Sequence, residues 1–364
     1  MHKTSAWPLA LAYSGLIVYA SLYPFSNWRD QGVGPWLFLS APLPRYWTGF
    51  DVVANVLGYV PLGFLLALSA LRTGRTRFAL SAALLVSIIL SLGLESLQVY
   101  LPDRVPSNLD LLLNVAGAVL GAGSAWTLER VGFLQRWSRF RAQWFVDESR
   151  GALVLLALWP AALLFPAVVP FGLGQVMERL ESVLADLLAD SPFLEWLPLR
   201  DFELQPMLAA AEWLSVLLGL LIPCLLGYCI IRYKVKRVWF VAWLMVFGVG
   251  ATALSTAMSF GPEHAWVWIN QPVKAALVSA VVLSGVLVWA PRRACAALAL
   301  LALGIELSLI NQTPVGPYFE QTLFLWEQGR FIRFHGVAQW LGWVWPFATL
   351  VYVLGLLWGN ELKN

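Results

Sequence analysis

Apolar stretches of about 18 to 24 residues recur along this chain of 364 residues and constrain its fold more than any other feature. A helix of about 20 apolar residues crosses the hydrocarbon core of a bilayer. Only 12% of the residues are charged, against roughly 25% in an average soluble domain. The sequence therefore excludes an ordinary soluble enzyme and predicts an all-α, polytopic integral membrane helical bundle of about ten transmembrane helices. The predicted spans cover residues 7–25, 52–71, 78–101, 109–128, 151–171, 208–231, 238–258, 273–290, 294–311 and 337–359.

The distribution of Lys and Arg predicts the orientation of these spans. Positively charged residues are enriched in the short cytoplasmic loops of membrane proteins. With ten spans, one set of alternate loops holds 16 of the 24 Lys and Arg residues, and the other set holds 8. The richer set includes both ends of the chain. We therefore expect a multi-pass membrane protein with cytoplasmic N- and C-termini and a retained first span.

Two segments outside the spans divide the chain. Residues 130–150 combine Arg with aromatic residues, which favours contact with anionic lipid headgroups over binding of nucleic acid. Residues 175–190 have apolar residues at helical spacing with acids between them, which predicts an amphipathic helix on the membrane surface or on the protein. The predicted parts are a four-span domain over 1–129, a basic cytoplasmic linker over 130–150, and a six-span membrane domain over 151–364 that includes an acidic outer loop.

Charged and amide side chains in and between the first four predicted spans indicate one candidate site. A charged residue inside a span costs about 2.5–3.5 kcal/mol, so it requires a partner or a function. Glu95 and Gln98 are three residues apart and share one helix face. Arg104 follows them in the turn to the next span. We expect one polar centre in the outer third of the membrane, with the candidate ligand-binding residues Asp51, Asn55, Glu95, Gln98, Arg104, Asp110 and Asn114.

The second and fourth predicted spans carry the same polar pattern. Asp, Asn and Gly occur at positions i, i+4 and i+7 of each span. Because both spans run in the same direction, the pattern predicts a parallel tandem repeat of helical hairpins in the first four spans. Gly117 and Gly121 form a GxxxG pair, which permits close approach of a neighbouring helix. The expected helix-packing residues are Gly58, Gly63, Gly117 and Gly121.

Together with the sequence Pro61-Leu62-Gly63, this arrangement resembles the VanZ-like family of bacterial integral membrane proteins over about residues 50–125. That family is named for a member associated with resistance to the glycopeptide antibiotic teicoplanin. The resemblance implies a location in the bacterial cytoplasmic (inner) membrane and a role in the cell envelope and in antibiotic resistance. It implies no defined biochemical activity.

Three functions remain open. The first is binding, or binding with transport, of a lipid-linked cell-wall precursor or a glycopeptide-related molecule whose phosphate or carboxylate meets Arg104. The second is a membrane-embedded enzyme acting on a lipid head group, with Glu95 as acid or base and Asp110 or Asp51 as its opposite. The absence of a nucleophile elbow and of a phosphate-binding glycine loop weighs against an enzyme. The third is a structural or partner-binding scaffold in which the Asp and Asn residues cap their helices.

The remaining residues indicate neither a cofactor nor a metal. The three cysteines lie in apolar runs, and the three histidines are scattered singly. The expected partners are therefore membrane lipids and the envelope molecule, and not nucleic acid. Glu306 is a further acid inside a predicted span, for which pairing with Gln312 or Arg330 is the alternative to a function.

Overall fold

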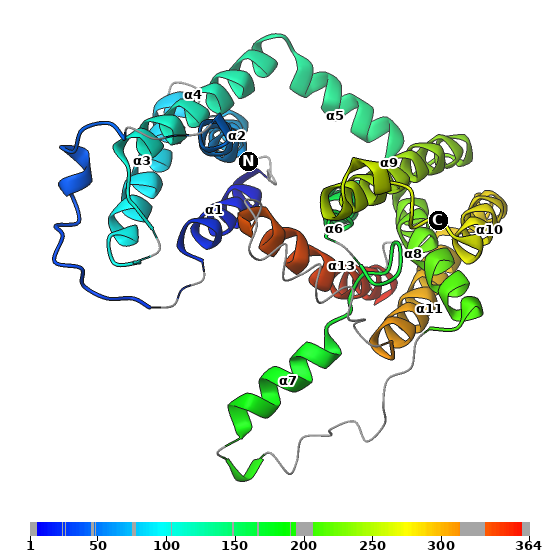
Figure 1. The fold of residues 1–364 in the computed structure, drawn as a ribbon. Helices are drawn as coiled ribbons and strands as arrows, with labels where there is room; N and C mark the ends of the chain where they lie inside the picture. The colour runs from blue at the N-terminus through cyan, green and yellow to red at the C-terminus, as the bar shows by residue number, and fades with distance from the viewer. Residues whose placement is uncertain are drawn as a thin grey trace. The chain divides into compact units, whose positions relative to one another are not determined.

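The computed structural model describes residues 6–23, 25, 27–44, 47, 49–74, 78–102, 104–147, 149–165, 167–189, 191–193, 207–313 and 332–358. These residues form twelve α-helices and two short 3-10 helices, η1 (Leu37–Leu39) and η4 (Pro262–His264) (Figure 1). The chain divides into two compact units, Met1–Phe140 and Arg141–Asn364. The boundary lies within the segment predicted to link two domains.

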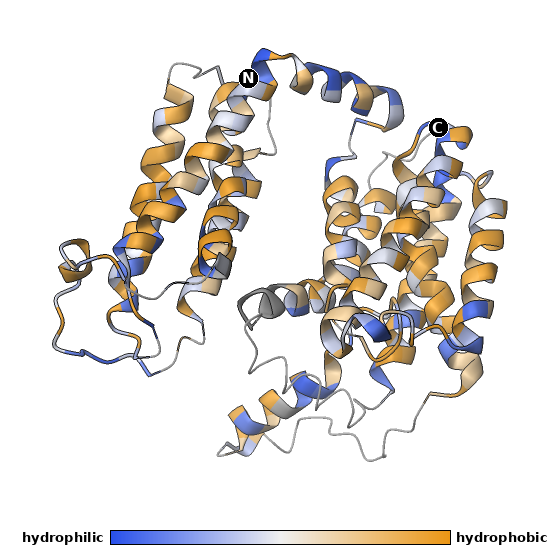
Figure 2. Ribbon diagram, turned by 45° about the horizontal axis from the view of Figure 1, so that its top comes forward, coloured by the Kyte–Doolittle hydropathy of each residue, from blue (hydrophilic) through white to orange (hydrophobic). Residues whose placement is uncertain are grey.

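Ten of the helices are apolar, and each overlaps one predicted span. Hydrophobic residues cover most of their length (Figure 2). The prediction of an all-α, multi-pass membrane protein is therefore confirmed. Seven helices are long enough to cross a membrane: α2 (Gly49–Arg72), α3 (Ala79–Gln98), α4 (Asn108–Arg130), α8 (Ala209–Ile230), α9 (Lys234–Phe260), α11 (Arg292–Asn311) and α13 (Ile332–Trp358). Three are shorter: α1 (Ala6–Leu22), α6 (Arg150–Ala162) and α10 (Gln271–Leu287).

The other two helices are amphipathic. Helix α5 (Phe133–Trp144) exposes Phe133, Trp137 and Phe140, which lie on one face at helical spacing. Helix α7 (Met177–Leu188) occupies the segment predicted to be amphipathic. Its exposed apolar side chains are Met177, Leu180, Val183 and Leu187. Residues 194–206 of the predicted acidic loop lie outside the described residues.

Helix α2 is the centre of the first unit and packs against α1, α3 and, most extensively, α4. Its contact with α4 is made by backbone. A Cβ atom added to Gly117 would overlap the carbonyl oxygen of Val56, and one added to Gly121 would overlap that of Val60. Because the contact positions advance together along both chains, the two helices run parallel at this contact. Only glycine permits this distance.

The second unit is built around α8, which packs against α6, α9, α10 and α11. Of its most apolar window, 89% is buried inside the protein, against 28–39% for the other six long helices. Every residue from Ser215 to Ile230 is buried. Because α8 has neighbours on all sides, it has no lipid-facing stripe, whereas α9, α10 and α11 each expose large apolar side chains.

The predicted fifth span, 151–171, is helical only over Arg150–Ala162. The stretch predicted as one span contains Pro166, whose ring would clash with the carbonyl of Ala162 in a continuous helix. Pro170 repeats this restriction one turn later. Beyond α6 the described chain is non-helical up to residue 176, yet Leu163, Phe165, Val169, Phe171 and Leu173 are buried. Apolar composition predicts burial of this segment but not its backbone conformation.

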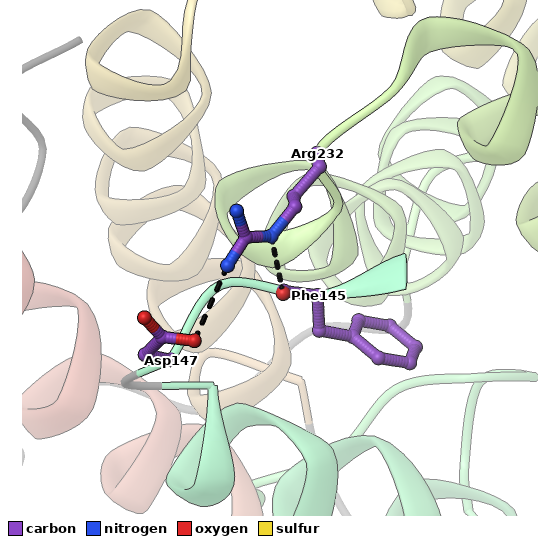
Figure 3. A network of polar contacts seen from close by, with 3 residues as sticks. All are labelled: Phe145, Asp147 and Arg232. Atoms are coloured by element: carbon purple, nitrogen blue, oxygen red, sulfur yellow. Dashed lines mark hydrogen bonds and ion pairs between the residues drawn. The ribbon is translucent and has the colours of Figure 1, made fainter. Parts of the chain in front are cut away.

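Two arginines close the end of the second unit where α8 leads into α9. Arg232 Nε donates to the carbonyl of Phe145 at 2.7 Å, and its Nη2 contacts Asp147 at 3.2 Å (Figure 3). Arg237 is 5% exposed and donates to the carbonyls of residues 228, 288 and 290. These carbonyls lie at or near the C-terminal ends of α8 and α10, where the helix dipoles favour a cation. Sequence counting assigned both arginines to topology alone.

The glycine contact gives a direct test. Gly121→Ala should lower the free energy of unfolding by about 1–3 kcal/mol, because the added methyl group must separate two packed backbones. Thermal unfolding of the purified, detergent-solubilised protein measures this loss. Gly123→Ala is the matched control, since nothing lies within 4 Å of its added Cβ. Equal stability of the two variants would contradict the close-packing interpretation.

Candidate functional site

The inner part of the candidate site is a row of polar residues on α3. Ser87, Ser91 and Glu95 follow one another at intervals of four, so they lie on one helix face. All three are buried, and Glu95 is 4% exposed. Ser87 Oγ donates to the carbonyl of Ala83. The other two side chains point to contacts with α2 and α4, which form the rest of the site.

Glu95 is positioned by the start of α4. Its Oε2 accepts the backbone N–H of Ser107 at 2.9 Å. Ser107 is the N-cap of α4, and its Oγ accepts the N–H groups of Leu109 and Asp110 at 3.1 and 3.4 Å. A carboxyl group is stabilised at a helix N-terminus because the unpaired N–H groups and the helix dipole both favour negative charge. This bond from Ser107 to Glu95 joins the last part of α3 to the start of α4, across the turn that connects them.

Asn114 extends the polar row into α4. Its Nδ2 donates to Ser91 Oγ at 3.0 Å. Its Oδ1 is buried and has no hydrogen-bond partner among the described residues. Tyr59 of α2 is also buried, and its hydroxyl interacts with Ser91 and lies near Glu95. Three helices thus contribute polar atoms to one buried cluster, and one acceptor in it remains open.

Asn55 and Asp110 form the rim of the site. Asn55 Nδ2 donates to Asp110 Oδ1 at 2.8 Å, which joins the polar face of α2 to the first turn of α4. Asp51 lies one turn before Asn55, and its side chain is exposed. The rim is therefore partly accessible, whereas Glu95 and Asn114 lie deeper.

Arg104 and Gln98 contact the end of α1 and the residue after it. Arg104 Nη2 donates to the carbonyl of Tyr23 at 2.7 Å, and Gln98 Nε2 donates to that of Ser21 at 3.1 Å. The following loop is held to the same region, since Gln31 Nε2 donates to the carbonyl of Val99. The polar residues Gln98, at the end of α3, and Arg104, after it, thus secure the connection between α1 and α2. Asp103 and Arg45, which neighbour this region in sequence, lie outside the described residues.

The two matching sequence patterns occupy different environments. Gly117 lies directly against α2, whereas an added Cβ at Gly58 would meet nothing within 4 Å. The carbonyl of Gly58 instead accepts the Tyr13 hydroxyl of α1. Gly63 lies against the backbone of Ala118. Of the four predicted packing glycines, the structure places Gly63, Gly117 and Gly121 at the contact between α2 and α4.

Sequence reasoning missed Ser91 and Tyr59, which contact Asn114 and Glu95. The signal for Ser91 was present, because Ser87, Ser91 and Glu95 have i, i+4, i+8 spacing. Serine is common in membrane helices, so its presence in a span indicates a site less strongly than a charge does. Tyr59 had no signal of its own, since tyrosine is frequent at span ends.

The cluster offers oxygen acceptors, one amide and one phenol, which suit hydrogen bonding to a polar ligand. Among the described residues, no group of three His, Cys, Asp or Glu side chains is placed to hold a metal ion. The polar atoms lie between membrane-spanning helices, where any unpaired group is costly. The buried part of the site, around Glu95 and Asn114, can therefore accept hydrogen bonds from hydroxyl or N–H donors.

Comparison with known proteins identifies the family of the first unit. Residues 4–129 match the family described as VanZ/LLP1. This part of the chain is a VanZ/LLP1 domain. No curated protein and no solved structure matches the chain. The predicted family resemblance is thus confirmed.

The VanZ/LLP1 domain begins earlier than the polar motifs indicate. The resemblance rests on residues 50–125, whereas the family match also covers α1. Helix α1 and the residue after it contribute mainly apolar packing, together with the Tyr13 bond to Gly58 and the carbonyls of Ser21 and Tyr23. Backbone acceptors leave no trace in a sequence motif, which explains why α1 was not part of it.

The contact between Asn55 and Asp110 can be measured by a double-mutant cycle. Asn55→Ala and Asp110→Ala should each destabilise the VanZ/LLP1 domain, and their coupling energy should be about 1–3 kcal/mol because the acceptor is a carboxylate. Unfolding of wild type, both single variants and the double variant gives this coupling. Asp30→Ala combined with Asn55→Ala is the control, since Asp30 is exposed and bonds Gly32. A coupling no larger than that of the control pair would exclude the contact.

Proposed function

We propose that all ten apolar helices cross a bacterial cytoplasmic membrane, with both chain termini in the cytoplasm. The distribution of Lys and Arg supports this orientation. It places the turn from Gln98 to Asn108 on the outer side. The parallel contact of α2 and α4 also supports a tandem repeat of helical hairpins in α1–α4, whose two copies have since taken different roles.

We further propose that the VanZ/LLP1 domain binds a lipid-linked molecule of the cell envelope, or a glycopeptide-related one, at the polar centre. The observation that carries this proposal is the buried cluster of Tyr59, Ser91, Glu95 and Asn114, in which Asn114 Oδ1 has no partner among the described residues. Buried polar atoms are almost always paired. An open acceptor inside a membrane bundle therefore favours a ligand that supplies a donor.

The chemistry of the site indicates which parts of the ligand go where. Sugar hydroxyl and amide N–H groups are donors, and they match the acceptor-rich deep cluster. A phosphate or carboxylate would be repelled by Asp51, Glu95 and Asp110, so it belongs near Arg104, which contacts the carbonyl of Tyr23 after α1. The lipid tail of the ligand would lie along the apolar helix faces, as the membrane lipids do. A role in antibiotic resistance follows if the bound molecule is the target of a glycopeptide.

Arg104 provides the test of this proposal. Arg104→Gln should weaken binding of a polyprenyl-diphosphate-linked disaccharide peptide about 10- to 100-fold, because one charge-assisted contact is lost. Titration of the purified full-length protein, followed by tryptophan fluorescence, measures the dissociation constant. The same titration with teicoplanin distinguishes the glycopeptide from the lipid.

Arg29→Gln is the matched control, since Arg29 is an exposed arginine that lies near Tyr100. Its affinity should remain within about twofold of wild type. Equal affinities of the Arg104 variant and wild type, with both proteins folded, would refute the binding site. Conversion of the lipid into a product would favour the enzyme instead.

A further inference from the structure

The second unit contains a buried acid that the VanZ/LLP1 domain does not explain. Glu306 lies on α11 and is 2% exposed. Its Oε1 accepts the hydroxyl of Ser215 on α8 at 3.0 Å. Its Oε2 is buried and has no hydrogen-bond partner among the described residues. Gln312, a candidate partner from the sequence, bonds Ser308 instead, and Arg330 lies outside the described residues.

The surroundings of Glu306 are apolar. On its own helix the buried neighbours are Ala299, Ala302, Leu303 and Ile310. No Lys or Arg among the described residues forms an ion pair with it, since the described ion pair joins Arg232 and Asp147. A carboxylate in such a place is strongly unfavourable without a counter-charge. One hydroxyl does not supply that charge.

The segment 163–176, non-helical over its described residues 163–165 and 167–176, contacts α8 and α11 one turn from Ser215 and from Glu306. Gly172 contacts the side chain of Ile310, one helical turn beyond Glu306. The carbonyl of Phe171 lies against Gly219, one turn beyond Ser215. The segment is secured by Asn311, whose Nδ2 donates to the carbonyl of Gly174 and whose Oδ1 accepts the N–H groups of residues 176 and 177. It is therefore held between the two helices that carry Glu306 and Ser215.

The backbone of this segment is strained at Phe171. Phe171 has φ of 64°, a left-handed conformation that is rare for a bulky residue. Its ring is held between Trp159, at 6.4 Å between centroids, and Trp268, at 5.7 Å. Non-helical backbone at membrane depth is tolerated where it is buried in protein, and its free carbonyls are cation ligands in many transporters.

We propose that Glu306, Ser215 and the segment 163–176 form a site for a monovalent cation, in which a proton or Na⁺ occupies the open side of the Glu306 carboxylate. Carboxylate, hydroxyl and backbone carbonyl oxygens suit either cation. A proton would be held on Oε2 itself. Na⁺ would lie between Oε2 and backbone oxygens of the segment. Either cation neutralises the buried charge, and its release would couple a charge change to the packing of α8, α11 and the segment.

The ionisable groups on the packed elements include Glu212, which lies one turn before Ser215 on α8, and Arg179, which lies over the ring of Trp343 on α13. On α8, Glu212 bonds Asn270 near the start of the helix, and Cys224, Tyr228 and Cys229 lie at least two turns beyond Ser215. On α11, Arg292, Arg293 and Cys295 lie three turns before Glu306. On the described side chains of α13, Tyr352 contacts Gly151 of α6. The described segment 163–176 contains no ionisable side chain.

The site can be tested by thermal unfolding of the purified full-length protein. Wild type, Glu306→Gln and Ser215→Ala are compared in NaCl and in choline chloride at equal ionic strength, and then over a range of pH. Glu178→Gln is the matched control, because this carboxyl is exposed on α7. A cation that binds only the folded protein raises its Tm.

If Na⁺ is the ligand, NaCl should raise the Tm of wild type and of the control by about 3 °C relative to choline, and this rise should be lost in Glu306→Gln. If a proton is the ligand, Na⁺ has no effect, but the difference in Tm between wild type and Glu306→Gln changes with pH. Identical Na⁺ and pH dependence of these two proteins overturns the proposal. If Glu306→Gln does not fold, Ser215→Ala provides the test. The proposal is then overturned if the Na⁺ concentration or the pH at the midpoint of the change in Tm is the same in Ser215→Ala as in wild type.

Discussion

The backbone contact between α2 and α4 determines the geometry of the candidate site. Gly117 and Gly121 bring the two helices so close that Asn55 reaches Asp110 across the contact. With α3 packed against both helices, Ser91 and Glu95 then meet polar groups of α2 and α4. A wider separation would leave these groups unpaired in an apolar environment, so packing and polar chemistry depend on the same two glycines.

The second unit satisfies its buried polar groups in a different way. It uses single side chains that each hold several backbone groups, such as Arg237 at the ends of α8 and α10 and Asn311 at the segment 163–176. These side chains replace the hydrogen bonds that a regular helix would make for itself. Glu306, by contrast, accepts only the hydroxyl of Ser215, and its Oε2 has no hydrogen-bond partner among the described residues.

The periodic and compositional features of the chain were the predictable ones. Ten apolar runs located ten helices, and charged or amide residues such as Glu95 and Asn114 located the polar centre, because charge inside a span has few explanations. The end of α6 was predictable in principle from Pro166, but the apolar composition of residues 151–171 favoured one continuous span. Tyr59 and the carbonyls of α1 could not be found, because their role depends on which helices become neighbours, and one sequence does not contain that information.

The enclosure of α8 has a consequence for the assembly of the protein. A helix whose final surroundings are protein alone has no need of a uniformly apolar surface, yet α8 keeps one along almost its whole length. Membrane helices insert individually before they associate. The composition of α8 therefore suits its temporary lipid environment during synthesis, before α9, α10 and α11 have emerged to surround it. The apolar sequence of α8 thus reflects its insertion into the membrane during synthesis more than its surroundings in the folded protein.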